Sequence, residues 1–103
     1  MEGHSLISSG ILASYAADAA LEVSGVGGLA EGPLHRPRGV KVTEEDGAVS
    51  VELHLVVDWG ASVPEVGAAV QRRVVDYLGR MADVAPSAVD VVVDEIGPPP
   101  APE

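Results

Sequence analysis

Residues 49–57 alternate between apolar and polar side chains, and this pattern constrains the fold more than any other feature. The apolar positions are Val49, Val51, Leu53, Leu55 and Val57. The polar positions between them include Ser50, Glu52 and His54. Successive side chains of a strand point to opposite faces of its sheet, so the pattern predicts a strand with one buried face. We expect the odd-numbered residues to face a core and the even-numbered residues to face away from it.

Two further strands are predicted on either side of this segment. Val40 and Val42 form a short alternating segment, and Asp46-Gly47 separates it from the longer strand. Asp-Gly between alternating segments is typical of a tight hairpin, because glycine tolerates positive φ, so these two strands should be antiparallel neighbours. A last strand is expected over residues 89–96, with its apolar positions on one face: Val89, Val91 and Val93.

Helical spacing of apolar residues predicts two helices. The first covers about residues 9–23, with Ser8 or Ser9 as N-cap and Gly25 where a left-handed residue would end it. The second begins at residues 62–65, because Ser-Val-Pro-Glu has the form of a capping box with proline in the first turn. Its apolar stripe consists of Val63, Val66, Val70, Val74, Tyr77, Leu78 and Met81.

The order of these elements predicts the fold class. Residues 25–39 contain five glycines and two prolines, so we expect a loop there rather than a helix or a central strand. With a short strand at Leu6-Ile7, the predicted order is (β)-α-β-β-α-β. Packing both helices on one face of a three- to four-stranded, mainly antiparallel sheet buries every apolar face, which gives a two-layer α+β sandwich. Residues 1–97 are predicted to form a single domain, and residues 98–103 a flexible proline-rich tail.

Composition excludes several classes of site. The chain has 103 residues, with 16 acidic and 6 basic side chains, a net charge of −10 and no cysteine. Disulfides and cysteine metal sites are therefore excluded, and the charge opposes binding to nucleic acid or anionic lipid. No apolar run approaches the roughly 18 to 20 residues of a membrane span, and residues 1–10 lack the pattern of a secretory signal. We expect a folded cytoplasmic protein that does not insert directly into a membrane.

No residue pattern indicates catalysis, a metal or a cofactor. The histidines lack a metal-ligating spacing and are predicted to be solvated surface residues: His4, His35 and His54. The acidic run at residues 44–46 lacks the pattern of a calcium loop. Asp90 and Asp94 lie four residues apart on one strand, about 13 Å, too far to act on one bond. We therefore predict no enzymatic activity.

Two surfaces are candidates for binding. Arg36, Arg38 and Lys41 form a basic cluster, which is either a docking site for an anion or acidic partner or part of a flexible connector. The uncovered face of the sheet is the other candidate, with Val56 and Val92 flanked by His54 and bordered by Trp59. Isolated exposed valines are also common on protein surfaces, so both interpretations of this face stay open.

Several segments together resemble a known family, the alkaline-shock and general-stress protein family of Gram-positive bacteria, also called the envelope stress response family. The similarity extends over about residues 5–97. Its most specific parts are E-V-x-G-V at residues 22–26, the apolar strand that ends in Trp59-Gly60, and x-P-E-V-x-x-x-V-Q at residues 63–71. Further matching segments are residues 7–12, 19–21, 39–42 and 89–93. The alanine- and valine-rich composition with a proline-rich tail suits a high-GC actinobacterial member.

The resemblance implies a non-enzymatic cytoplasmic protein that contributes to envelope-stress tolerance. Such a protein gathers near the inner membrane face by binding a membrane-anchored partner protein, often itself a family relative. Self-association into a homo-oligomer is the other kind of assembly that we consider. The family has no characteristic catalytic or cofactor-binding residues. The alternative is a small module that binds nucleic acid or an anionic ligand through residues 36–41, which the net charge disfavours and whose binding would weaken steeply with salt.

Overall fold

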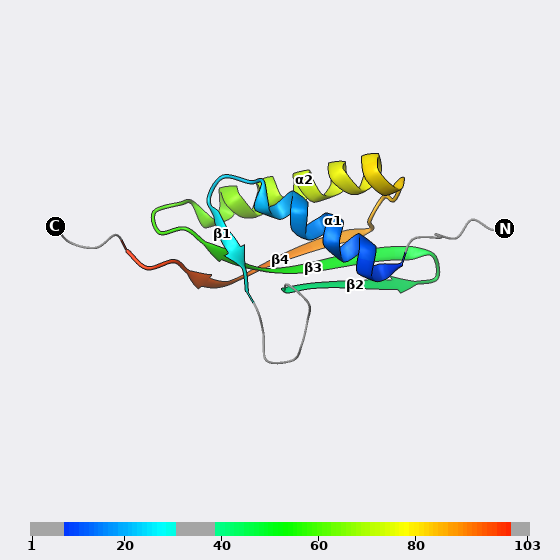
Figure 1. Ribbon diagram of the computed structural model, residues 1–103, viewed down its shortest axis with the longest axis horizontal. Coiled ribbons are helices and arrows are strands. Elements are labelled where there is room, and N and C mark those ends of the chain that lie inside the picture. The colour runs from blue at the N-terminus through cyan, green and yellow to red at the C-terminus, as the bar shows by residue number, and fades with distance from the viewer. Residues whose placement is uncertain (1–7, 31–38, 100–103) are drawn as a thin grey trace.

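The alternating segment forms β3 (Ala48–Val57), the central strand of a four-stranded sheet (Figure 1). The computed structural model describes residues 8–30 and 39–99. The five odd-numbered residues of β3 are at most 6% exposed, whereas the even-numbered residues from Ser50 to Val56 are partly exposed. The two faces are therefore assigned as the sequence predicts.

The predicted hairpin is confirmed. β2 (Val40–Glu45) pairs antiparallel with β3, from Val40 opposite Leu53 to Glu45 opposite Ala48. Asp46 and Gly47 at its tip both have positive φ, 52° and 82°. Two positive φ values are what a two-residue turn needs to match the twist of its strands.

The last strand, β4 (Ala88–Ile96), lies parallel to β3 along its other edge. Parallel neighbours need a long crossover connection, which α2 (Val63–Ala82) provides. The register shifts after Leu55 opposite Val93, so that Val56 lies opposite Glu95 and one residue of β4, Asp94, is extra. This irregularity is a β-bulge, which turns an additional side chain toward one face of the sheet.

The prediction that residues 25–39 form only a loop is wrong at β1 (Val26–Leu29), which pairs antiparallel with the end of β3. Because β4 occupies one edge of β3, β1 and β2 share the other edge end to end. β1 is a short edge strand, and such a position tolerates glycine. A Cβ atom on Gly27 would approach Asp58 Oδ1 to 2.6 Å, so a glycine suits this close packing.

The described elements follow the order α-β-β-β-α-β. The strand predicted at Leu6-Ile7 and most of the predicted loop, residues 31–38, lie outside the described residues, as does the end of the predicted tail, residues 100–103. The fold class is α+β, as expected from the sequence.

Both helices begin at serine caps. Ser8 Oγ accepts a hydrogen bond of 3.2 Å from the Ile11 N–H at the start of α1 (Ser9–Leu21). This helix ends two residues earlier than predicted, so Gly25, with φ 97°, lies in the turn beyond it. Ser62 Oγ accepts from the Glu65 N–H at 3.4 Å, and the predicted start of α2 is confirmed.

The core lies between the sheet and the two helices, which cover the same face of the sheet (Figure 1). α1 contributes mainly small side chains, so it packs close to its neighbours. Its buried residues are Leu12, Ala16, Ala17, Ala19 and Ala20. α2 contributes Val66, Val70, Val74 and Leu78. Val63 and Met81 of the predicted stripe are instead exposed, because they lie in the first and last turns of α2. Neither described helix is long and apolar enough to cross a membrane.

Candidate functional site

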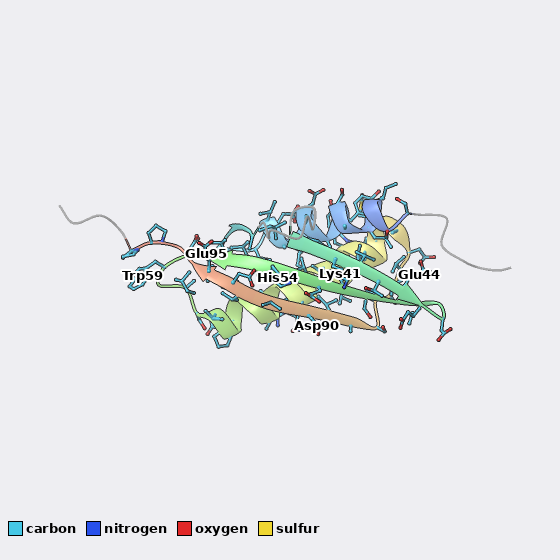
Figure 2. All side chains as sticks on the ribbon, turned by 90° about the horizontal axis from the view of Figure 1, so that it is seen from below. Lys41, Glu44, His54, Trp59, Asp90 and Glu95 are labelled. Atoms are coloured by element: carbon cyan, nitrogen blue, oxygen red, sulfur yellow. The ribbon has the colours of Figure 1, made fainter. Side chains whose placement is uncertain are left out.

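Within residues 8–30 and 39–99, no helix lies over the sheet face opposite α1 and α2 (Figure 2). We call it the open face. By strand register and side-chain contact it is formed by Lys41, Thr43, Ser50, Glu52, His54, Val56, Ala88, Asp90, Val92, Asp94 and Glu95. Figure 2 looks onto this face and shows His54 near its middle, with Lys41 and Asp90 on the neighbouring strands. The open face is the candidate functional site.

A cluster of three titratable side chains lies at its centre. His54 Nδ1 is 3.0 Å from Asp94 Oδ1 and 3.1 Å from Asp94 Oδ2. On the other side of the ring, Nε2 is 2.6 Å from Glu52 Oε2. Asp94 lies two residues after Val92, the register partner of His54, so alternation along β4 turns its side chain to the same face as His54. The prediction that His54 is a solvated surface residue is therefore wrong, since its side chain is 19% exposed and pairs with two carboxylates.

The two carboxylates favour the protonated form of the imidazole. The hydrogen bond with Asp94, followed by that with Glu52, raises the pKa of His54 above its ordinary value of 6.5. Partial burial of the ring opposes this rise. Lys41 and Asp90 are the register partners of Glu52 on β2 and β4 and are the nearest charged neighbours of the cluster by register.

The geometry of the cluster limits the chemistry it can perform. Glu52 and Asp94 contact opposite nitrogens of His54, so the three groups do not converge on one point. Among the described residues, no group of three or more histidine, cysteine, aspartate or glutamate side chains could hold a metal ion. Carboxylates at both nitrogens favour the protonated form of the imidazole, and this form cannot act as a general base. The cluster can bind and release a proton at His54.

The other predicted residues of this surface are brought together only in part. Val92 lies opposite His54 in the register and is 39% exposed. Val56, two residues after His54 on β3, is half-buried. Trp59 is 59% exposed in the turn after β3, at one end of the sheet rather than on its face (Figure 2).

The predicted basic cluster is described only at Lys41, since Arg36 and Arg38 lie outside the described residues. Lys41 is exposed on β2 and lies opposite Glu52, among acidic neighbours. The described part of the open face is thus acidic overall.

A second surface, missed in the sequence, is a groove of about 620 Å³ where the end of α1 meets the start of α2. Small residues line it, among them Gly25, Ala61 and Ala69, with Arg72 at its side. An ion pair between Arg73 and Glu22, 3.4 Å, joins the two helices nearby. The pair Ala68-Ala69 in α2 could have indicated this groove in the sequence, because small residues leave space on a helix surface.

Two uncharacterized proteins are similar in sequence. Spy1535 of Streptococcus pyogenes serotype M6 is 37% identical over 54 residues, which are 52% of this chain and 42% of that protein. YqhY of Bacillus subtilis strain 168 is 31% identical over 83 residues, which are 71% of this chain and 62% of that protein. This chain therefore spans less than two thirds of the length of either relative.

Among solved structures, the fold is similar to that of the MamM CTD. A zinc form has a TM-score of 0.60 with 18% identity and covers 84% of both chains. A manganese form has a TM-score of 0.60 with 19% identity and covers 84% of this chain and 96% of that one. At this identity the similarity concerns the fold alone.

A family model matches residues 1–98, which is nearly the whole chain. Its description is the ASP23 family, with a cell envelope-related function. The resemblance to alkaline-shock proteins inferred from the sequence is thereby confirmed. The chain belongs to the ASP23 family, the alkaline-shock proteins, whose function is related to the cell envelope.

Proposed function

We propose that this chain acts in the envelope stress response by binding a partner protein through the open face, and that it catalyses no reaction. The observation that supports the proposal is the open face itself, where exposed Val92 lies beside a charged cluster and no helix of the described residues covers this side of the sheet (Figure 2). Membership of a cell envelope-related family supports the biological setting. As the resemblance to alkaline-shock proteins implies, the proposed partner is membrane-anchored and holds the chain at the inner membrane face.

The charges of the open face indicate the chemistry of the partner. Glu52, Asp90, Asp94 and Glu95 lie on this face with Lys41 and the protonatable His54. An acidic surface with an apolar centre complements a partner that carries lysine or arginine around an apolar contact. A second copy of this chain, with a net charge of −10, is disfavoured at the same surface.

The cluster supports the non-enzymatic part of the proposal. In a Ser-His-Asp arrangement the imidazole uses one nitrogen for the carboxylate and keeps the other for the nucleophile. Here the second nitrogen of His54 is taken by Glu52 at 2.6 Å. The arrangement therefore suits charge presentation rather than proton abstraction.

A matched pair of variants tests the proposal. Val92→Lys places a charge on the open face, whereas Val75→Lys makes the same change on α2, where Val75 is 46% exposed. Both variants should keep the stability of the parent within about 0.5 kcal/mol, because both side chains are exposed at the surface, Val92 by 39% and Val75 by 46%. In the host cell, we expect Val92→Lys to leave the membrane fraction and to lower survival under envelope stress, and Val75→Lys to behave as the parent.

Equal membrane recovery of the two variants would contradict the open face as the binding surface. Light scattering of the purified parent provides a second measurement, since a stable homo-oligomer lost in Val92→Lys would identify a second copy as the occupant.

A further inference from the structure

We propose that the outer edge of β4 binds an extended segment of a partner protein, which adds to the sheet as a further strand and carries lysine or arginine on its open-face side. The inference rests on the proposed function, association with a partner, and specifies how that partner is bound. Strand addition uses the backbone of an exposed edge for affinity and alternate side chains for specificity.

The first observation is that this edge is long and apolar and that no described strand pairs with it. β4 has nine residues, six of them apolar, and within residues 39–99 it pairs with β3 alone. The N–H groups of Ser87 and Gly97, which flank the strand, donate to the carbonyl oxygens of Val49 and Val57, both at 2.7 Å. Since strand amides alternate in direction, the amides of Asp90 and Val92 point away from β3.

The second observation is that the helix layer does not cover β4 as fully as β3. Val89, Val91 and Val93 face the helices but are only half-buried, whereas their register partners on β3 are at most 1% exposed. The helix-facing side of β4 therefore keeps apolar surface that an added strand would bury.

A glycine in α2 leaves space at the same place. Gln71 Nε2 donates to the Val89 carbonyl oxygen at 2.8 Å, so this face of α2 is turned toward β4. Gly67 lies one turn earlier on that face, and a Cβ atom there would have no neighbour within 4 Å. Glycine destabilises the interior of a helix, and no contact of the described chain requires it at this position. Side chains of an added strand would fit into this space.

The third observation is the charge of the edge, which selects the partner. Asp90 and Glu95 are exposed on β4, and Glu52 and Asp94 lie beside them on the open face. Charged residues and bulges on an edge strand discourage it from pairing with the same edge of another molecule. The acidic residues of β4 would therefore repel the β4 of a second copy. The same charges attract a segment with basic side chains.

β2, the longer of the two strands on the other edge of the sheet, does not offer comparable apolar surface. β2 has six residues, it ends in Glu44 and Glu45, and α1 packs over it so that Val40 is 2% exposed. A strand added there would bury little apolar surface. The inference is therefore restricted to β4.

The first experiment measures amide hydrogen exchange by NMR in the full chain. The probe is a peptide of about ten residues in which valine and lysine alternate, and the control peptide alternates valine and glutamate. We expect the valine–lysine peptide to slow exchange of the Asp90 and Val92 amides at least about tenfold, with no change at β2, and the control peptide to have no effect. Protection at β2, or none at β4, would overturn the inference.

The second experiment compares two charge variants that raise the net charge equally. Asp90→Lys with Glu95→Lys alters the β4 edge, and Glu44→Lys with Glu45→Lys alters the β2 edge. The β4 pair should weaken binding of the valine–lysine peptide by about tenfold or more, and the β2 pair by less than about threefold. Equal weakening by both pairs would indicate non-specific attraction to the whole chain and would overturn the inference.

The two proposals fail in different ways. If Val92→Lys releases the chain from membranes while no peptide protects the β4 amides, only the strand-addition inference is overturned. If the peptide protects those amides while the parent never sediments with membranes, only the proposed function is contradicted.

Discussion

His54 links two strands that are distant in the sequence. It lies two residues from Glu52 on β3 and forty residues from Asp94 on β4. Because the ring is mostly covered, its charge is screened less than that of an exposed side chain. The protonation state of this single residue therefore affects both the pairing of β3 with β4 and the charge of the open face.

Stability should consequently depend on the pH through His54. Its pKa is raised in the folded state, so its contribution is fully present below the unfolded value of about 6.5 and is lost as the pH rises through the folded pKa. We expect the unfolding free energy of the parent to exceed that of His54→Gln most near pH 5.5, and the difference to shrink above the folded pKa. Urea unfolding of both proteins across this range measures it, and a difference independent of pH would contradict the assignment.

The two carboxylates should contribute unequally to the pKa of His54. Asp94 approaches Nδ1 with both oxygens and is the larger cause of the rise, ahead of Glu52. We therefore expect Asp94→Asn to lower the pKa of His54 more than Glu52→Gln does. An NMR titration of the His54 ring provides the values, and the reverse order would show that Glu52 dominates.

Half of this cluster was predictable from the sequence. Glu52 and His54 are two residues apart in an alternating strand, which places them on one face. The contact with Asp94 was not predictable, because it requires the parallel pairing of β4 with β3 and the register that sets Val92 opposite His54. Val56 and Val92 were placed on the correct face, since only the alternation of each strand was needed.

At the scale of elements, alternation predicted the strands and capping residues predicted the helix starts correctly. The high glycine content of residues 25–39, by contrast, led to the prediction of a loop where β1 forms. The limits of β3 and the start of α2 followed from local patterns in the sequence. β1 did not, because its strand conformation depends on hydrogen bonds to the end of β3 and not on its own propensity. The parallel position of β4 likewise follows from the crossover through α2.

The register of β3 predicts the cost of a core truncation. Leu53 is completely buried, so Leu53→Ala should lose about 2 to 5 kcal/mol of unfolding free energy. Val75→Ala, at an exposed position of α2, should change it by less than about 0.5 kcal/mol. Urea unfolding measures both, and a loss below about 1 kcal/mol at Leu53 would be inconsistent with the observed packing.

The two interior glycines of α2 predict a gain in stability. A Cβ atom at Gly67 or Gly79 would meet no atom within 4 Å. Alanine at either position should raise the unfolding free energy by about 0.5 to 1 kcal/mol, because glycine is the poorer helix former. Thermal unfolding of each variant tests this, and destabilisation by Gly67→Ala would show that the flank of α2 beside β4 is closely packed.

At the scale of the whole molecule, excess negative charge opposes the compact state. The net charge is −10, and the ion pairs Arg73–Glu22 and Arg80–Asp76 are exposed and contribute little. The fold class was nevertheless predictable, because two amphipathic helices and strands with one apolar face leave few arrangements.

Salt should therefore stabilise the parent chain. Raising NaCl from about 20 mM to about 500 mM shortens the Debye length and screens the repulsion among acidic side chains. We expect the thermal midpoint to rise by a few degrees, as differential scanning calorimetry would show. A fall in the midpoint would mean that attractive ion pairs outweigh the repulsion.

The inequality of the two sheet edges limits the stoichiometry of any assembly built by strand addition. β4 offers an apolar edge that pairs with no other described strand, whereas β2 is short, ends in two glutamates and lies under α1. A chain with one accepting edge terminates a sheet and cannot propagate it. Such chains would bind one strand each and remain separate copies, so that any layer they form would have its spacing and density set by the number of binding segments on the partner.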